Sequence, residues 1–398
     1  MVNYKKYGMN LYEYRRSLGN GKIKSLFTSF KTSFTENLMQ KLARLVKTAG
    51  IETIDFQDHY AAIKIHFGEY GNLAFLRPNY AKVIADIVKE QGGKPFLTDC
   101  NTLYVGSRKN AVDHLETAYM NGFTPYATGC PVIIADGLKG TDEALVPVDG
   151  EYIKEAKVGR ALMDADILIS LTHFKGHEAT GFGGAIKNIG MGGGSRAGKM
   201  DQHSAGKPYV RRRLCVGCGM CTRVCAHSAI TIDERKAEID HEKCVGCGRC
   251  VGVCPKDAVT PEFSESNDIL NCKMAEYTLA ICKDRPCFHI SLICDVSPNC
   301  DCHAENDRPI IPNVGMLASF DPVALDMACA DLCNQQPVLS NSVLAENMEQ
   351  HKHEHGDCDC EHGHDHFYFT HPDTNWRSCI EHAVKIGLGT DQYELIEV

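Results

Sequence analysis

Two runs of cysteine in the middle of the chain constrain its fold more than any other feature. They read CVGCGMCTRVC and CVGCGRCVGVCP, and each has the spacing Cys-x2-Cys-x2-Cys-x3-Cys. The cysteines are Cys215, Cys218, Cys221 and Cys225 in the first run and Cys244, Cys247, Cys250 and Cys254 in the second. This is the ligand spacing of bacterial ferredoxins that hold two 4Fe–4S clusters.

In ferredoxins of this type, three closely spaced cysteines bind one cluster and the fourth ligand comes from the other run. The pattern therefore predicts one cluster on Cys215, Cys218, Cys221 and Cys254, and another on Cys244, Cys247, Cys250 and Cys225. Pro255 follows the second run, whereas Ala226 takes that place in the first. Zinc knuckles also use paired cysteines, but three at consecutive x2 intervals, twice over, favour clusters.

The composition limits the classes of protein to which this chain can belong. The chain has 398 residues, of which 43% are hydrophobic, and this suffices for two or three domains. We find no apolar run near the ~20 residues of a membrane span and no signal peptide, so we expect a cytoplasmic protein without a membrane partner. In a reducing compartment the 21 cysteines do not form a disulfide framework. The net charge of −9 argues against a nucleic-acid partner.

Strand and helix signals alternate along the chain. Strands are expected at 61–67, 95–99, 131–136 and 165–171. Helices are expected after Thr35 as N-cap, from Pro78, near 110–121, from Pro322 with Asp321 as N-cap, and over 376–386, and apolar periodicity resumes over 273–281. Such alternation predicts a layered α/β fold with a mostly parallel sheet.

The cysteine runs interrupt this pattern. We expect residues 208–265 to be a bacterial-type two-cluster ferredoxin-like (α+β) domain, inserted into one α/β domain formed by residues 1–207 and 266–398. Residues 351–366, HKHEHGDCDCEHGHDH, form a low-complexity tract. This tract is either a loop that binds zinc or nickel through imidazoles or a disordered insertion.

A glycine-rich segment precedes the cysteines and reads THFKGHEATGFGGAIKNIGMGGGSRAGKMDQH. An imidazole near a lysine can act as a base or a ligand, which makes His177 and Lys187 candidate catalytic residues. Glycines let the backbone approach a ligand and leave amides free for anions. The cofactor-binding candidates are Gly181, Gly183, Gly184, Lys187 and His203. The alternative is a glycine-rich surface loop.

Residues 193–200 approach a Walker A loop but lack its final hydroxyl, which argues against an ATPase.

Further candidates lie at strand ends and in a second cysteine motif. His66 is a third candidate catalytic residue, and we expect it to line one cleft with Lys187, Glu69, Asn101 and Arg108, because α/β domains bind ligands at strand ends. In CDVSPNCDCHAEND, the candidate metal ligands are Cys294, Cys300, Cys302 and His303, because thiolates two apart with a nearby histidine suit zinc, nickel or an extra iron site. The alternative for these thiols is burial in a core.

The chain as a whole resembles the iron–sulfur branch of the domain-of-unknown-function family 362. The pieces that match are KIHFGEYGNLAFLRP, PFLTDCNTLYVGSRKNAVDHL, HFKGHEATGFGGAIKNIGMG, the two cysteine runs, SPNCDC, LASFDPVALD and HPDTNW. In this family the reaction is unassigned. HEATGFGGAIK is also similar to a motif of nickel-pincer lactate racemases. That resemblance implies His177 as general acid or base, Lys187 as covalent cofactor anchor and His203 as nickel ligand.

Three functions remain open. The first is an oxidoreductase that passes electrons between a redox partner protein and a small-molecule substrate through two 4Fe–4S clusters. The second is an electron carrier or scaffold, which needs no ligand pocket near Lys187. The third is a nickel- or zinc-handling protein, or a nickel-pincer-like isomerase.

Overall fold

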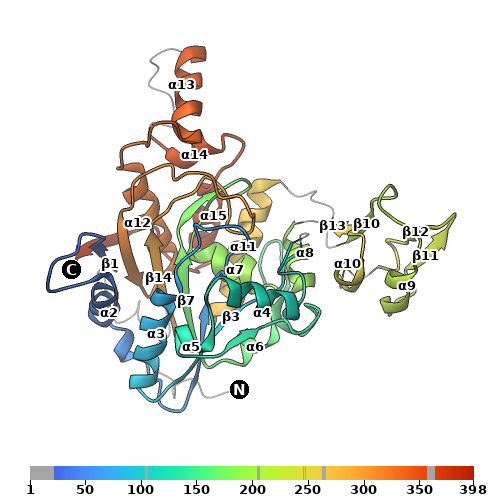
Figure 1. The fold of residues 1–398 in the computed structure, drawn as a ribbon, viewed down its shortest axis with the longest axis horizontal. Coiled ribbons are helices and arrows are strands. Elements are labelled where there is room, and N and C mark those ends of the chain that lie inside the picture. The colour runs from blue at the N-terminus through green and yellow to red at the C-terminus, as the bar shows by residue number, and fades with distance from the viewer. Residues whose placement is uncertain are drawn as a thin grey trace.

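An eight-stranded sheet forms the centre of the computed structural model, which describes residues 22–103, 106–203, 207–244, 246, 248–261, 266–355 and 364–398 (Figure 1). The strands, from edge to edge, are β16 (Tyr393–Glu397), β1 (Ile23–Ser29), β15 (Gly315–Ser319), β14 (Cys287–Ile293), β7 (Ile167–His173), β2 (Tyr60–Lys64), β3 (Lys94–Asp99) and β4 (Val132–Ile134). Strand β15 runs antiparallel to both neighbours, and every other pair is parallel. The predicted α/β class with a mostly parallel sheet is confirmed.

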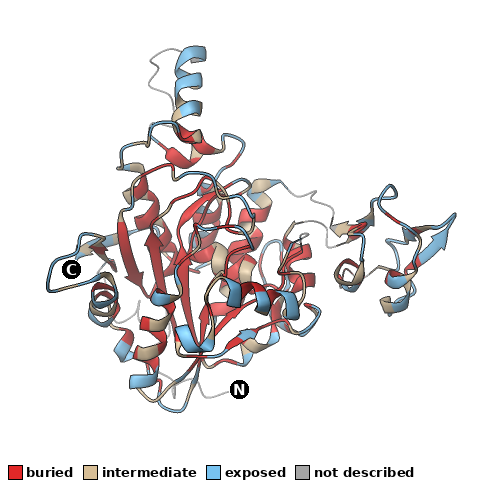
Figure 2. Cartoon of the chain, in the orientation of Figure 1, coloured by how far each residue is buried: buried red, intermediate tan, exposed pale blue. Residues whose placement is uncertain are grey.

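The sheet is covered on both faces, so every residue of its central strands β7 and β14 is buried (Figure 2). Successive side chains of a strand point to opposite faces. Accordingly, Ile167, Ile169 and Leu171 of β7 pack with α2 (Leu38–Thr48) and α3 (Pro78–Glu90), whereas Leu168 packs with α11 (Asn267–Cys282) on the other side. The fold is therefore three layers, helix on sheet on helix.

The helices of the α/β layers begin and end mostly where the sequence predicts. They are α2 (Leu38–Thr48), α3 (Pro78–Glu90), α4 (Ala111–Met120), α5 (Pro125–Thr128), α6 (Arg160–Asp164), α11 (Asn267–Cys282), α12 (Pro322–Asn334), α13 (Val343–His355), α14 (His366–Thr370) and α15 (Arg377–Lys385), with a 3-10 turn at Ile51–Thr53. Asp321 caps α12 by accepting the N–H groups of Val323 and Ala324. The prediction of Thr35 as N-cap of α2 is wrong, because Asn37 forms a capping box with Gln40.

The glycine-rich segment is folded and buried rather than a surface loop. Two short paired strands, β8 (Lys175–His177) and β9 (Gly181–Gly183), lead into α7 (Ala185–Gly193) and α8 (Arg196–His203). Gly190 of α7 faces α11 so closely that a Cβ there would lie 2.2 Å from the carbonyl oxygen of Met274. Glycine is thus needed for the close packing of α7 on α11, and the surface-loop alternative is wrong.

Residues 207–261, which we call the cysteine lobe, project from the side of the α/β body (Figure 1). Its elements are β10 (Pro208–Val210), α9 (Met220–Val224), β11 (Ile230–Asp233), β12 (Lys236–Ile239), α10 (Arg249–Val253) and β13 (Val259–Pro261). Strands β10 and β13 pair with each other, so the chain enters and leaves the lobe at adjacent points. That the lobe is a two-cluster ferredoxin-like domain stays a prediction, as do the proposed domain bounds.

Two further segments complete the fold. Strands β5 (Glu143–Pro147) and β6 (Glu155–Gly159) form a hairpin outside the main sheet. Helix α13 projects from the body and ends at His355, so the histidine tract begins on a helix; residues 356–363 of that tract lie outside the described residues. Among the described helices, none has the length and apolarity that a membrane span requires.

Candidate functional site

A cavity of about 60 Å³ lies where β2, β3 and β7 end. This is the edge at which open parallel sheets bind ligands. We call it the basic pocket because five cationic side chains line it: Lys64, Arg108, Lys175, Lys187 and Lys199. Its other walls include His66, Asp99, Cys100, Thr172, His173, Gly183, Gly184, Asn188, Cys300 and Cys302. The pocket therefore collects residues from the strand ends, from α7 and α8, and from the loop of the second cysteine motif.

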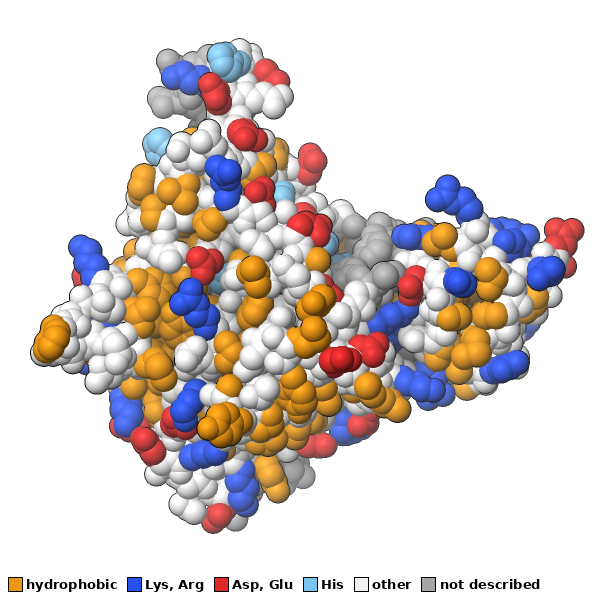
Figure 3. Space-filling view, viewed as in Figure 1, with side chains coloured by type: hydrophobic (Ala, Val, Ile, Leu, Met, Phe, Trp, Pro, Cys, Tyr) orange, Lys and Arg blue, Asp and Glu red, His pale blue; other side chains and the backbone are white. Residues whose placement is uncertain are grey.

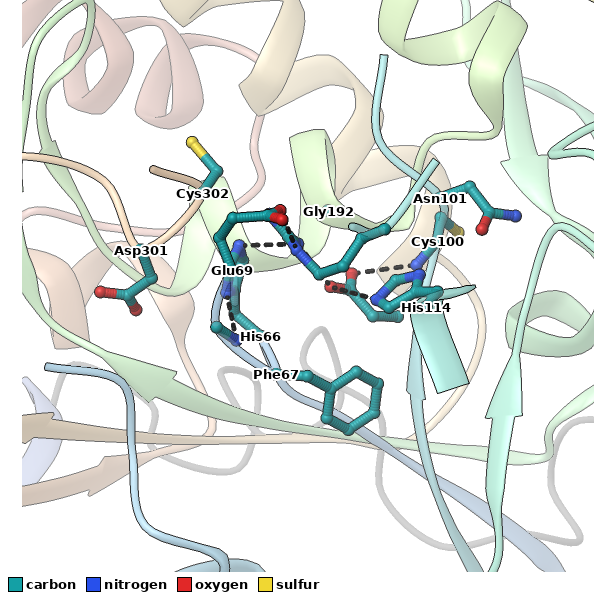
Figure 4. Close-up of polar contacts among 12 residues, drawn as sticks. His66, Phe67, Glu69, Cys100, Asn101, His114, Gly192, Asp301 and Cys302 are labelled. Atoms are coloured by element: carbon teal, nitrogen blue, oxygen red, sulfur yellow. Dashed lines mark hydrogen bonds and ion pairs between the residues drawn. The ribbon is translucent and has the colours of Figure 1, made fainter. Parts of the chain in front are cut away.

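Arg108 is fixed at one end of the pocket, with an exposed fraction of 1%. Its Nε donates to Glu69 Oε2 over 2.9 Å, and its Nη1 lies 3.1 Å from His66 Nε2. In Figure 4 His66 and Glu69 lie between Asp301 and Cys302 on one side and Cys100, Asn101 and His114 on the other. Burial and the charge of Arg108 lower the pKa of His66 well below its usual value, so this imidazole is neutral at pH 7.

Lys64 points from β2 toward the pocket and is 1% exposed. Its ammonium contacts Asp99 Oδ1 and Asn188 Oδ1, each at 2.9 Å. Burial alone would raise the pKa of Asp99, but the charge of Lys64 holds this pKa below the usual range. A lysine in the otherwise apolar strand AAIKIHF is thus explained by a buried ion pair that joins β2, β3 and α7.

Lys175 and His173 share a second buried carboxylate, Asp301. The Lys175 ammonium lies 3.2 Å from Asp301 Oδ2, and His173 Nδ1 lies 2.9 Å from the same oxygen. His173 Nε2 is 2.7 Å from the carbonyl of Cys294. Asp301 therefore anchors the loop of Cys300 and Cys302 against β7 and β8.

Lys187 and His177 both face Cys300. The Lys187 ammonium lies 3.5 Å from Cys300 Sγ, and the amide of Cys302 donates to the same sulfur over 3.4 Å. Hydrogen bonding from Cys302 and the charge of Lys187 lower the pKa of Cys300, although burial opposes this. His177 Nδ1 accepts the amides of Ala179 and Thr180, which leaves its Nε2 side toward Cys300 and Glu178.

Only two of the three glycines predicted to bind a cofactor line the pocket. Gly183 and Gly184 line the pocket, whereas Gly181, at φ +80°, packs against Trp376. The expectation that the amides after these glycines are free for anions is wrong at the start of α7. The amides of Ala185 and Ile186 both donate to the buried carboxylate of Asp326. Burial raises the pKa of Asp326 to about 7.

Two predicted residues lie beside the pocket rather than on its walls. His203 ends α8, and burial together with the charges of Lys187 and His177 lowers its pKa to about 3. It therefore lies within the electrostatic reach of both residues. Asn101 donates to Asp136 and to the carbonyl of Gly137, away from the pocket walls.

A group suited to a metal ion lies at the outer side of the same loop. One ligand atom each from Glu178, Cys302 and His303 lies within 4.8 Å of the others. His303 Nε2 is 2.8 Å from Glu178 Oε1. Cys302 thus lines the pocket and belongs to this group as well, whereas Cys300 faces Lys187.

In the cysteine lobe, four thiols surround one small cavity of about 20 Å³. The cavity is lined by Cys215, Cys218, Cys221 and Cys254, with apolar residues such as Val216, Ile232 and Val259. Backbone amides point at three of the lobe's sulfurs: Ala229 N–H at Cys225, Ala237 N–H at Cys215 and Ala258 N–H at Cys254, at 3.2–3.3 Å. Gly219 and Gly248 start α9 and α10 in the left-handed region, so the two runs repeat one local geometry. Cys247 lies outside the described residues.

Arg196, at the start of α8, joins the lobe to the body. Its guanidinium, fully buried, donates to the carbonyls of Lys139, Thr102 and Lys109. A Cβ on Gly248 would lie 2.9 Å from the Arg196 side chain, and one on Gly252 would lie 3.2 Å from it, so α10 packs on this arginine. An ion pair between Lys109 and Asp257 adds a second link.

Comparison with known proteins places the chain in a family. The model of the family described as Domain of unknown function (DUF362) matches residues 61–331, more than half of the chain. The chain belongs to the DUF362 family. The match includes the strand ends, the glycine-rich helices, the cysteine lobe and the loop of Cys300 and Cys302.

More distant similarities accompany this DUF362 membership. The thylakoid-associated protein sll1697 of Synechocystis is 25% identical over 119 residues, which are 30% of this chain and 33% of that protein. A structural-genomics crystal structure of a Thermotoga maritima protein has a TM-score of 0.40 at 14% identity, covering 75% of this chain and 58% of that one. The lactate racemase apoprotein of Thermoanaerobacterium thermosaccharolyticum has a TM-score of 0.33 at 11% identity, covering 69% and 51%. At these TM-scores the two structures support no inference about chemistry.

Several pocket residues of this DUF362 chain were not predicted from the sequence. Lys64, Lys175 and Lys199 line the pocket, and Asp99 and Asp301 neutralise two of them. Lys64 carried a usable signal, because a lysine inside a buried parallel strand requires a partner. Lys199 carried none, since a lysine on a short polar helix is ordinarily solvated.

Proposed function

We propose that this DUF362 protein is a redox enzyme, in which two 4Fe–4S clusters in the cysteine lobe exchange electrons with a reaction site in the basic pocket. One observation carries the proposal: Arg196 contacts α10, which bears the predicted ligand Cys250, and it stands one helical turn before Lys199, which lines the pocket. One turn of α-helix spans about 5 Å. Helix α10 and the pocket therefore contact residues of α8 that are about one turn apart.

The donor set of the lobe fits the proposed clusters. Four thiols from both runs line a single cavity, which supports the proposed exchange of ligands between the two runs. When bound, each 4Fe–4S cluster supplies one-electron transfer at a potential between about −700 and +450 mV. The amides that point at Cys215, Cys225 and Cys254 hold these sulfurs in place and stabilise negative charge on them.

The pocket residues have the properties that proton-coupled chemistry needs. His66 is neutral and half-buried beside Arg108, and it is the proposed proton donor or acceptor. Lys187 keeps its charge because the sulfurs of Cys300 and Cys302 outweigh the effect of burial and raise its pKa. His177 orients toward the same sulfur. These residues would hold a substrate and move protons while electrons arrive from the lobe.

A dedicated electron carrier is a weaker explanation. Such a protein needs no ligand pocket near Lys187, and a cavity is present there, lined by charged groups that are costly to bury. A carrier would gain nothing from five buried or half-buried cations.

The proposed redox partner is an acidic protein. A groove of about 380 Å³ lies between the body and the lobe and is lined by Lys139, Arg223 and Arg249 together with the predicted cluster ligand Cys225. Figure 3 shows Lys and Arg side chains spread over the lobe and its junction. Opposite charge on a partner would steer it toward this half-buried sulfur.

The test is electron paramagnetic resonance of protein reduced under anaerobic conditions. We expect signals of two interacting clusters in the wild type, loss of one cluster in Cys254→Ser, and loss of the other in Cys225→Ser. Arg196→Ala should keep both signals but slow electron transfer from the lobe to a pocket-bound acceptor. If Cys225→Ser and Cys254→Ser leave both clusters intact, the ligand assignment is wrong.

A second candidate is a metal centre at Glu178, Cys302 and His303, because these three already converge. Carboxylate, thiolate and imidazole together suit zinc or nickel. In this alternative the protein handles nickel or zinc, or acts as a nickel-pincer-like isomerase with Lys187 as covalent anchor. Two measurements distinguish this alternative from the redox enzyme. Mass spectrometry of the Lys187 peptide detects a covalent anchor, and titration of Cys302→Ser with zinc or nickel tests the metal site. Deletion of residues 351–366 tests whether the histidine tract supplies the metal.

A further inference from the structure

The basic pocket contains more positive charge than its own residues neutralise. Lys64 pairs with Asp99, Arg108 with Glu69, and Lys175 with Asp301. Lys187 has the sulfur of Cys300 as its partner. These four pairs account for four of the five cations that line the cavity.

Lys199 is the fifth cation, and it has no carboxylate within ion-pair distance among the described residues. Its ammonium donates to the backbone carbonyls of Gly192 at 3.2 Å and Gly194 at 2.6 Å. The side chain is 7% exposed. Carbonyl groups orient an ammonium without neutralising it, and the carboxylates of Asp136 and Asp99 act on Lys199 only from beyond ion-pair distance, so the pocket retains an excess of positive charge.

Hydrogen-bond donors are also in excess at the Arg108 end of the pocket. Arg108 Nη2 is buried and has no partner among the described residues. His66 Nδ1 faces the amide of Gly68 at 3.0 Å while His66 Nε2 faces Arg108 Nη1 at 3.1 Å. A neutral imidazole accepts at one ring nitrogen, so one of these two donors also lacks an acceptor. Buried donors without acceptors are uncommon and indicate a missing ligand.

The volume limits the size of that ligand. A water molecule needs about 10–15 Å³ of such space, so 60 Å³ accommodates roughly four to six non-hydrogen atoms. Two acceptor oxygens on one planar group match the fork of a guanidinium.

We propose that the basic pocket binds a small planar monoanion, a short-chain carboxylate or an inorganic oxyanion, between Arg108 and Lys199. This deepens the proposed function, since it names the substrate class of the same pocket. It does not depend on the clusters, because the charges and donors that carry it belong to the α/β body.

The test is isothermal titration calorimetry of the anaerobically purified holoprotein with acetate, nitrate and neutral acetamide. Acetate and acetamide have nearly the same shape, so their comparison isolates the charge. We expect at least one of the two anions to bind at least about tenfold more tightly than acetamide, as hydrogen bonds to charged groups imply. The relative affinities for acetate and nitrate distinguish a carboxylate site from an inorganic oxyanion site. Equal affinity for all three, or binding of none, overturns the proposal.

Lys199→Met sharpens the result, with Lys154→Met as matched control. Lys154 also donates to a backbone carbonyl, that of Gly150, but lies outside the pocket and is exposed. We expect Lys199→Met to weaken anion binding about tenfold or more and Lys154→Met to leave it unchanged. An unchanged affinity in Lys199→Met overturns the assignment; should this variant not fold, the comparison of acetate with acetamide in the wild type decides. Iron and sulfide content, measured on the same samples, reports separately on the proposed clusters.

Discussion

The basic pocket and the cysteine lobe both bury reactive side chains, but they differ in what stabilises those side chains. In the pocket, nearly every charged side chain has a partner from another element, such as Lys64 with Asp99 or Lys175 with Asp301. In the lobe, the apolar core consists of few residues, and Cys215, Cys221 and Cys250 form part of it. The pocket is therefore organised by the protein alone, whereas we propose that the lobe depends on what its thiols bind.

The largest predicted effect concerns this dependence. Removal of iron should unfold the lobe and leave the sheet intact, because a segment of this size with a sparse core needs covalent or metal cross-links. Hydrogen exchange followed by mass spectrometry should show full loss of protection over 208–261 and retained protection in β7 and β14. Equal protection of the lobe with and without iron would show that the two regions do not differ in this way.

Breaking a pocket pair should destabilise the body instead. Lys64→Met takes from buried Asp99 its nearest cation and leaves it only Arg108 and His114, each at 3.8 Å, which costs up to about 3–5 kcal/mol of unfolding free energy. Lys94→Met, at the exposed start of neighbouring β3, is the matched control and should cost less than about 1 kcal/mol. Chemical denaturation of both variants measures the difference. Similar values for the two would contradict the buried ion pair as an organising contact.

Asp326 should give the body a distinct pH dependence. Burial raises its pKa to about 7 from 3.8, so the folded protein binds a proton that the unfolded chain releases. Its contribution to stability is complete below pH 3.8 and is lost as the pH rises through about 7, by up to about 1.4 kcal/mol per pH unit. Asp326→Asn should remove this slope between pH 5 and 7. An identical pH profile of melting temperature in wild type and variant would exclude Asp326 as its source.

The smallest effect is expected at the groove between the two regions. Arg223→Glu with Arg249→Glu should slow reduction by an acidic ferredoxin several-fold at low ionic strength of about 0.02 M. The difference should vanish at about 0.5 M salt, where surface charges are screened. Reduction by dithionite should be unchanged in both conditions. A salt-independent effect would place the defect in the clusters rather than in docking.

The fold was largely predictable because its signals are local. Pro78 and Asp321 start helices by their own chemistry, and the buried strands are short apolar runs. Strand β1, IKSLFTS, was missed because its polar and apolar residues come in pairs instead of alternating. Asn37 rather than Thr35 caps α2 because the capping box needs Gln40 three residues on.

The site was predictable only in part. His66, Arg108 and Lys187 were singled out by their places at strand ends or among glycines, and they do line one pocket. The carboxylates that neutralise the lysines come from distant segments, as Asp301 does for Lys175, and no local pattern identifies such a pair. Asp326 was unforeseen for the same reason: it meets α7 across about 140 residues of chain.

The central claim is that the lobe's thiols hold iron and inorganic sulfide next to a charged pocket. Iron, acid-labile sulfide and zinc should therefore be measured in protein purified without exposure to air. Two clusters predict about eight iron and eight sulfide per chain, with no stoichiometric zinc. Protein that is free of sulfide, or saturated with zinc at these cysteines, would contradict the account.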